Sequence, residues 1–159
     1  MTYLRERKEI LDLNFYLWRI RDERRGEWKK EVLLIGDEHA LETMVESLLG
    51  LLDSYYRYGT GTRRYKCNQP RDFDHVAYGR QHHVRIEWLE SLVVKIASEV
   101  PNEEMYTLEG KNVGIRVNPT TLNQIIAGAR AQLDTGKRYG HGSPAACGLR
   151  FSPDWLGVE

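Results

Sequence analysis

A strand and a helix are predicted to follow one another directly in residues 28–52, which read WKKEVLLIGDEHALETMVESLLGLL. The apolar run at residues 32–35 is typical of a strand that is covered on both faces. Asp37 can cap the helix, because its carboxylate can accept a hydrogen bond from a free backbone N–H group of the first turn. Apolar residues then recur every three or four positions and predict one buried helix face: Leu41, Met44, Val45, Leu48 and Leu52.

The residues around this unit predict a second strand before it and a loop after it. Apolar and more polar side chains alternate in residues 10–20, which is the period of a half-buried strand. The polar run at residues 22–27 contains Gly26 and predicts the turn between the two strands. After Asp53 the composition changes, so we expect a loop at residues 55–62 and irregular chain to about Gly79.

The second half of the chain predicts a long helix, a hairpin and another capped helix. Apolar residues at helical spacing in residues 82–100, ended by Pro101, predict the long helix. Residues 105–109 and 113–117 predict a hairpin that turns at Gly110. Asn118 is the expected cap of the last helix, and Pro119 suits its first position.

The two halves resemble each other at a constant offset of 81 positions, which pairs Asp37 with Asn118. The match continues into two similar loops, Arg57-Tyr58-Gly59 and Arg138-Tyr139-Gly140. We interpret this as an internal duplication of about residues 10–62 and 103–143 within a single domain, residues 1–159. The predicted fold is α+β, with one four-stranded, mainly antiparallel sheet, about three helices and two pseudo-symmetric strand–strand–helix–loop units.

Composition limits the classes of function. Hydrophobic residues make up 41% and charged residues 29%, as in a globular domain, and the formal net charge is zero. Zero net charge removes whole-molecule attraction to nucleic acid or anionic lipid, so any such binding must come from a local patch. The apolar stretches are far shorter than a bilayer span, so we expect no membrane association. Residues 1–9 lack a signal-peptide core, and two cysteines make no disulfide framework, so we expect a cytoplasmic protein.

The paired loops are the predicted ligand site. Guanidinium groups hold phosphate, glycines let backbone N–H groups approach an anion, and tyrosine rings can stack on a base. The candidate ligand-binding residues are Arg57, Tyr58, Gly59, Gly61, Arg63, Arg64, Arg138, Tyr139, Gly140 and Gly142. A purely structural interpretation stays open, because glycine is the usual C-terminal cap of a helix and Asp53 and Asp134 could each pair with the arginine four residues later.

The favoured function is a non-enzymatic binding module for an anionic ligand or single-stranded nucleic acid. No nucleophile motif and no recognised metal-ligand spacing is present, so we expect no catalytic residue, no metal and no cofactor. One alternative is a module that binds a protein partner, antitoxin-like or as a homodimer. The other is a metal-dependent hydrolase that uses Asp72, Asp74, His75 and His82, although these lack the spacing of known metal motifs and a solvated Asp/His loop is the favoured explanation.

Overall fold

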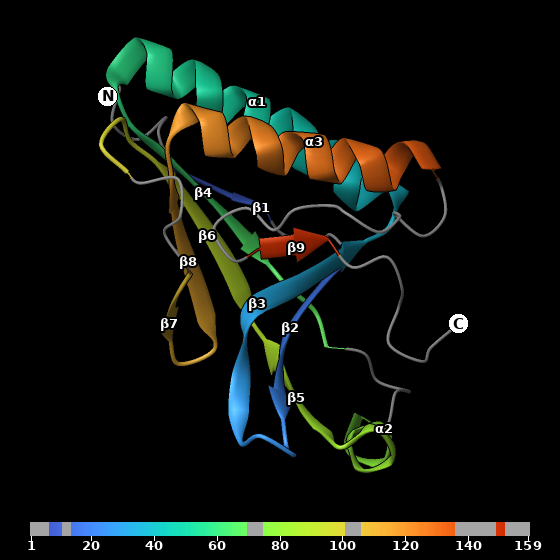
Figure 1. Cartoon of the computed structure of the whole chain (residues 1–159). Coiled ribbons are helices and arrows are strands. Elements are labelled where there is room, and N and C mark those ends of the chain that lie inside the picture. The colour runs from blue at the N-terminus through green and yellow to red at the C-terminus, as the bar shows by residue number, and fades with distance from the viewer. Residues whose placement is uncertain (1–6, 11–13, 70–74, 101–105, 136–148, 152–159) are drawn as a thin grey trace.

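A layer of two helices covers one side of two β-sheets (Figure 1). The computed structural model describes residues 7–10, 14–69, 75–100, 106–135 and 149–151. Helices α1 (Glu38–Tyr58) and α3 (Pro119–Thr135) lie side by side in the helical layer. The short helix α2 (His75–His82) lies apart from them, against β5 (Val84–Leu89).

Both sheets are mixed. The five-stranded sheet has the order β1-β4-β6-β8-β7, formed by β1 (Arg7–Ile10), β4 (Gly61–Lys66), β6 (Ser91–Ile96), β8 (Asn112–Val117) and β7 (Thr107–Glu109). The four-stranded sheet has the order β5-β2-β3-β9, in which β2 is Phe15–Asp22, β3 is Glu27–Gly36 and β9 is Leu149–Phe151. The pairs β1–β4, β6–β8 and β3–β9 are parallel, and the other pairs are antiparallel.

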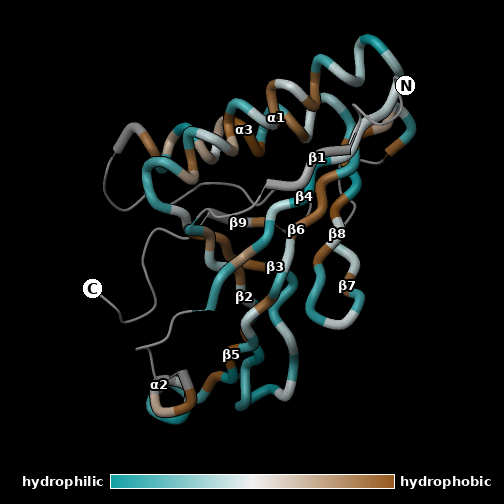
Figure 2. The backbone as a smooth tube through the Cα atoms, turned by 180° about the vertical axis from the view of Figure 1, so that it is seen from behind, coloured by the Kyte–Doolittle hydropathy of each residue, from teal (hydrophilic) through white to brown (hydrophobic). Residues whose placement is uncertain are grey.

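The two sheets adjoin, so one core serves both. The chain passes from β5 to β6 through the single residue Glu90, and the N–H group of Asn68, just after β4, donates to the carbonyl of Phe15 at 2.8 Å. The inner faces of both sheets pack against α1 and α3 in a continuous cluster that includes Phe15, Leu34, Met44, Val94 and Ile125. Figure 2 shows the apolar positions of both helices alternating with hydrophilic ones, as amphipathic helices require.

The caps predicted from the sequence set the helix boundaries. Asp37 accepts a hydrogen bond from the N–H group of Ala40 at 2.8 Å, and Asn118 accepts one from Thr121 at the same distance. Gly59 ends α1 with a φ of +78°, where its N–H group donates to the carbonyl of Tyr55. Gly110 turns the β7–β8 hairpin with a φ of +61°. The β2–β3 hairpin, the two capped helices (now α1 and α3) and the mixed α+β content are confirmed.

The predicted helix over residues 82–100 is wrong, because this segment forms the strands β5 and β6. Ile86 and Trp88 face one side of the four-stranded sheet, whereas Leu92, Val94 and Ile96 face the helices. The chain passes from one sheet to the other at Glu90. The apolar residues of β5 and β6 therefore follow two separate alternating patterns, and together these two patterns resemble helical spacing. The density of β-branched residues in the segment favours the strands that form.

Two further expectations need correction. The segment expected to be irregular continues as α1 to Tyr58, then forms β4 with buried residues at alternate positions, and later α2. The expected single four-stranded, mainly antiparallel sheet is replaced by the two mixed sheets. The internal duplication stays a prediction: α1 and α3 begin at matching positions, but β3 and β8 lie in different sheets, and residues 136–143 lie outside the described residues.

Candidate functional site

The first predicted loop is built as a helix end. Arg57 lies in the last turn of α1 and pairs with Asp53, with 3.0 Å between the guanidinium Nε and a carboxylate oxygen. Both side chains are more than half exposed, so this ion pair adds little stability. Gly59 is the left-handed cap, and Tyr58 beside it is partly exposed. The ion pair and the glycine cap are the two contacts that the purely structural interpretation predicts.

Arg63 is an internal anchor and not a surface residue, which corrects its predicted role as a phosphate ligand. It is 2% exposed, and its guanidinium donates to the carbonyls of Ser47 at 3.1 Å and Thr62 at 3.0 Å. Burial lowers the pKa of Arg63, an effect that the nearby Tyr65 partly opposes. The hydroxyl of Tyr65 shares a hydrogen bond with that of Ser47. Together Arg63 and Tyr65 tie β4 to the middle of α1.

The other predicted ligand residues do not assemble into a described site. Gly61 is buried in β4, and Arg64 is exposed on the same strand. Arg138, Tyr139, Gly140 and Gly142 lie outside the described residues, so the pairing of the two loops stays a prediction.

The residues of the metal alternative are only partly described. His75 begins α2 and His82 ends it, whereas Asp72 and Asp74 lie outside the described residues. Within the described part of the chain, no group of three or more His, Cys, Asp or Glu side chains could hold a metal ion.

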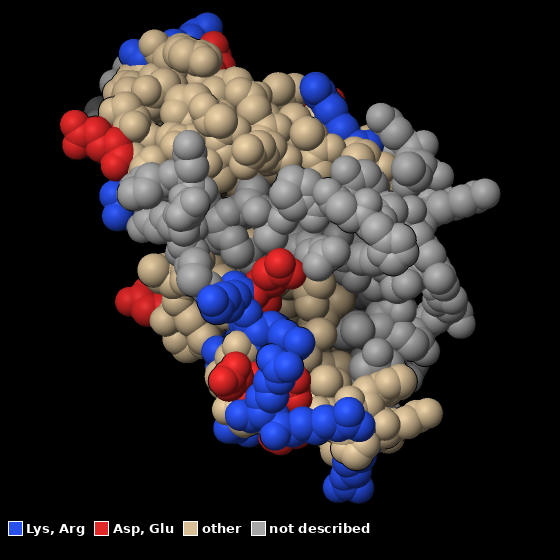
Figure 3. All heavy atoms as spheres, in the orientation of Figure 1, with Lys and Arg blue, Asp and Glu red and all other residues tan. Residues whose placement is uncertain are grey.

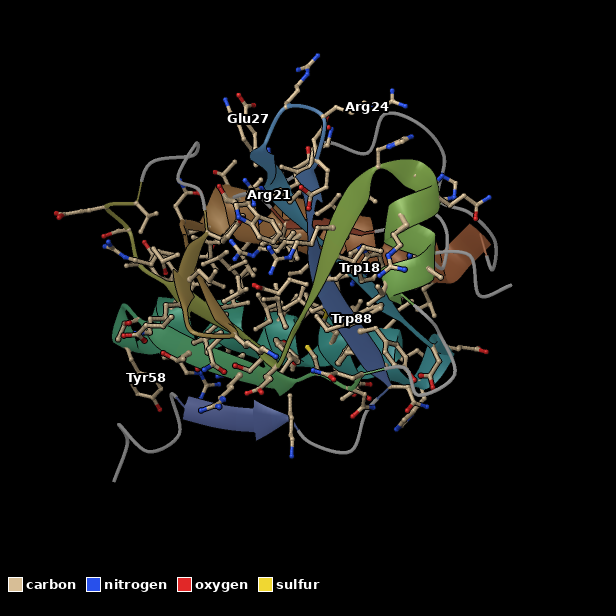
Figure 4. The ribbon with its side chains drawn as sticks, turned by 90° about the horizontal axis from the view of Figure 1, so that it is seen from below. Trp18, Arg21, Arg24, Glu27, Tyr58 and Trp88 are labelled. Carbon is tan, nitrogen blue, oxygen red and sulfur yellow. The ribbon has the colours of Figure 1, made fainter. Side chains whose placement is uncertain are left out.

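Lys and Arg side chains gather instead on the projecting end of the β2–β3 hairpin, which we call the arm (residues 19–30). The arm holds six Lys or Arg residues and three Asp or Glu residues, although the whole chain has no net charge. Figure 3 shows the basic side chains massed over this end of the molecule, with acidic ones among them. In Figure 4, Arg21 and Arg24 lie at the arm, well away from Tyr58. The arm and the first predicted loop are therefore separate surfaces.

One turn orders the tip of the arm. The carboxylate of Asp22 accepts hydrogen bonds from the N–H groups of Arg24 at 2.9 Å and Arg25 at 3.3 Å. Desolvation raises the pKa of Asp22, but these two bonds and the neighbouring cations outweigh it and lower the pKa overall. Gly26 closes the turn with a φ of +66°. The turn fixes the backbone from which Arg24 and Arg25 project into solvent.

Side chains on one face of the arm form two rows across three strands. Trp28, Arg21 and Arg85 are cross-strand neighbours in one row, and Arg19 and Glu87 are neighbours in the next. The Arg19 guanidinium lies 3.7 Å from the centre of the Trp28 ring and is 2.7 Å from a carboxylate oxygen of Glu87. We call this surface the arm face: Arg19, Arg21, Trp28, Arg85 and Glu87. It continues the inner face of the four-stranded sheet, since Leu17 and Leu34 follow on the same side of the strands.

A cavity of about 750 Å³ adjoins the arm face along β5, and we call it the β5 pocket. Arg80 of α2, Arg85 of β5 and Lys111 of the β7–β8 turn contribute its cations, and Glu23 and Glu87 its acids. Val76, Val84, Ile86 and Trp88 supply apolar lining. Its volume falls within the range of small-molecule sites. A hydrogen bond of 3.0 Å from the Glu23 N–H group to the His83 carbonyl joins the arm to this pocket.

A buried tryptophan pair packs on the face of the four-stranded sheet that lies opposite the arm face. Trp18 and Trp88 are cross-strand neighbours with ring centres 5.5 Å apart, and they pack with Ile86. Figure 4 shows both rings between the strands and α2. Gly79 of α2 packs so closely that a Cβ atom there would lie 2.4 Å from the carbonyl oxygen of Val84. The sheet and α2 thus hold the pocket walls in place.

Sequence reasoning missed this site because the arm was interpreted only as a turn. A usable signal was present in the unequal distribution of charge, since residues 19–30 hold six of the 23 Lys and Arg residues of a neutral chain. Prediction of the β5 pocket would have required the correct secondary structure for residues 75–89, which form α2 and β5.

Comparison with protein-family models, with curated proteins and with solved structures found no match to this chain. None of the helices in the described residues is long and apolar enough to cross a membrane.

Cys67 provides a test of the packing between the sheets. Its thiol is buried, and burial raises the pKa of Cys67 to about 12 from 9.0. The other cysteine of the chain is replaced (Cys147→Ala), so that only Cys67 can react. We then expect a thiol reagent at about pH 8 to modify Cys67 in the folded protein about 100-fold or more slowly than in urea-unfolded protein. Equal rates would show that Cys67 is accessible, contrary to its burial.

The same thiol makes stability depend on alkaline pH. Because the pKa of Cys67 is higher in the folded protein, its contribution to the free energy of unfolding is complete below pH 9 and is lost as the pH rises toward 12. Burial raises the pKa of Tyr65 as well, and this adds to the loss. Urea midpoints should fall between about pH 8 and about pH 10.5, and fall less in a Cys67→Ala variant.

Proposed function

We propose that this protein is a non-enzymatic binding module that holds a single strand of nucleic acid along the arm face and the β5 pocket. The observation that carries the proposal is the convergence of cations from three separate elements, Arg80, Arg85 and Lys111, around a tryptophan-containing apolar lining. Arginine and lysine side chains bind phosphate, and an apolar aromatic lining suits a base. The setting that we propose is the cytoplasm.

The arm favours an extended ligand over a small anion. Arg21 and Arg85 are neighbours across β2 and β5, and Arg24 and Arg25 follow at the tip. Because Glu23 lines the pocket and also precedes Arg24, the cations of the tip continue directly into the pocket. A ligand with several phosphates in series matches this arrangement better than one phosphate does.

Replacement of Arg80 and Arg85 by alanine tests the proposal directly. We expect the double variant to bind a fluorescent single-stranded oligonucleotide at least about 10-fold more weakly at low salt, because two phosphate contacts are lost. Its plot of log affinity against log salt should become shallower by about 1.4. Fluorescence anisotropy measures both quantities, with DNA, RNA and a mononucleotide as separate ligands.

The matched control replaces Arg57 and Arg64, the exposed arginines of the first predicted loop, by alanine. This variant should bind as the unmodified protein does, because neither residue lines the β5 pocket or belongs to the arm. The opposite outcome, with loss only in the Arg57/Arg64 variant, would return the site to the predicted loops. Absence of binding by the unmodified protein at low salt would refute the proposed function.

The two alternative functions, protein binding and metal-dependent hydrolysis, are tested by separate experiments. In the described part of the chain, β5 is the outer strand of its sheet, and an outer strand can pair with a strand of another protein. A stable dimer in light scattering would support that protein-binding alternative. The metal-dependent hydrolase alternative requires stoichiometric metal in elemental analysis of tag-free protein and its loss in a His82→Ala variant.

A further inference from the structure

We propose that Trp28 is the stacking platform for one base of the bound strand, with Arg19 as its fixed support. This inference rests on the proposed function and names the part of the ligand that the arm face recognises. Tryptophan offers the largest aromatic face among the side chains, and stacking on it accepts every base.

The first argument is that the platform is already formed without ligand. The Arg19 guanidinium lies 3.7 Å from the centre of the Trp28 ring, which is cation–π stacking distance. Arg19 is itself fixed by Glu87, with 2.7 Å between Nε and Oε1, and the two side chains are only 17% and 29% exposed. Because three side chains from three strands fix each other, the indole loses little freedom when a base stacks on it.

The second argument is that Trp28 differs from the other described tryptophans in its exposure. Trp18 and Trp88 are buried and pack against each other, so they form part of the structure. Trp28 is only half-buried, and it lies on the projecting arm. Arg19 covers one face of the indole, and the base would stack on the face that Arg19 leaves uncovered.

The third argument is the position of the cations relative to the ring. Arg21 is the direct cross-strand neighbour of Trp28, and Arg85 is the neighbour of Arg21 on the next strand. Adjacent strands lie about 4.8 Å apart, so this row places two cations within about 10 Å of the indole. A nucleotide stacked on Trp28 would therefore have its phosphates beside Arg21 and Arg85.

Trp28→Ala is the decisive variant. We expect the affinity for a single-stranded oligonucleotide to fall about 5- to 100-fold, whereas Trp28→Phe should retain most of it. The slope of log affinity against log salt should stay unchanged, because a stacked base releases no counterion. This unchanged slope distinguishes stacking from the loss of a phosphate contact in the Arg80/Arg85 variant.

Tryptophan fluorescence gives a second readout. With Trp155 replaced by Phe, the oligonucleotide should quench the emission, and most of the quenching should disappear when Trp28 is also replaced by Phe. Trp18 is fully buried and should not respond, and any quenching that remains should come from Trp88, which lines the β5 pocket. Quenching that is the same with and without Trp28 would overturn the stacking platform. Tyr56→Ala is the matched control, because Tyr56 is an aromatic side chain of α1 that is 71% exposed.

The possible failures are distinguishable. Unchanged binding by Trp28→Ala, together with loss in the Arg80/Arg85 variant, would overturn the stacking platform and leave the proposed function in place. A shallower salt slope in Trp28→Ala would also overturn it, because the residue would then act through the phosphate contacts. Failure of the unmodified protein to bind any oligonucleotide would instead remove the proposed function itself.

Discussion

Replacement of Trp18 by alanine should lower the free energy of unfolding by about 3–5 kcal/mol. Trp18 is fully buried, and its ring packs against Trp88 with 5.5 Å between the ring centres. The loss combines the transfer of a large apolar side chain with the cavity that remains beside Trp88 and Ile86. Urea unfolding followed by circular dichroism at about 222 nm measures the change, since this signal comes mainly from α1 and α3 and reports the whole transition.

Trp28→Ala is the matched control and should cost less than about 1 kcal/mol, because Trp28 is only half-buried and lies on the projecting arm. A double-mutant cycle between Trp18 and Trp88 should give a coupling of about 0.5–1.5 kcal/mol, as expected for an aromatic pair in contact. Equal losses for Trp18→Ala and Trp28→Ala would contradict the division between a buried structural tryptophan and a half-buried tryptophan of the arm.

Local signals in the sequence were sufficient for the parts of the fold that rest on local contacts. Asp37 and Asn118 cap helices because each side chain satisfies a backbone donor three residues later in the chain. Gly59 and Gly110 are needed where the backbone adopts a positive φ. These interactions span few residues, so the order of the residues was enough to predict them.

The parts that failed depend on contacts that are distant in the chain. Ile86 and Trp88 complete the face opposite the helices, whereas Leu92 and Val94 complete the main core, and only the tertiary fold separates these two environments. Arg63 looked like a surface cation because nothing near it in sequence shows that α1 will cover it. The helical spacing at residues 82–100 and the cations that follow α1 are present in the sequence, but neither pattern shows which surfaces pack together in the fold.

The candidate site was hidden for the same reason. Arg19 and Glu87 are 68 positions apart and become neighbours only when β5 pairs with β2. Lys111 reaches the β5 pocket through the adjoining five-stranded sheet. Sequence reasoning could have found the excess of cations at residues 19–30, but not the pocket beside it.

Replacement of Gly79 by alanine should separate α2 from β5 and reduce oligonucleotide binding at least about 10-fold. Alanine is favoured over glycine in a helix by about 1 kcal/mol, so propensity alone would predict a more stable α2. However, the new Cβ atom would lie 2.4 Å from the Val84 carbonyl oxygen, a backbone atom of a paired strand. The helix must therefore move, and it takes Arg80 and one wall of the β5 pocket with it. Anisotropy measures the affinity, and backbone amide chemical shifts locate the displacement.

Ala77→Gly in the same helix is the matched control for Gly79→Ala. It should weaken α2 by about 0.5–1 kcal/mol through backbone entropy, but it adds no atom against β5. If lower helix stability alone reduced binding, Ala77→Gly would bind more weakly and Gly79→Ala would not. If the close contact between α2 and β5 positions Arg80, only Gly79→Ala loses affinity, and its shifts extend along β5 to Trp88. Normal binding by Gly79→Ala would mean that the wall formed by α2 is not part of the ligand site.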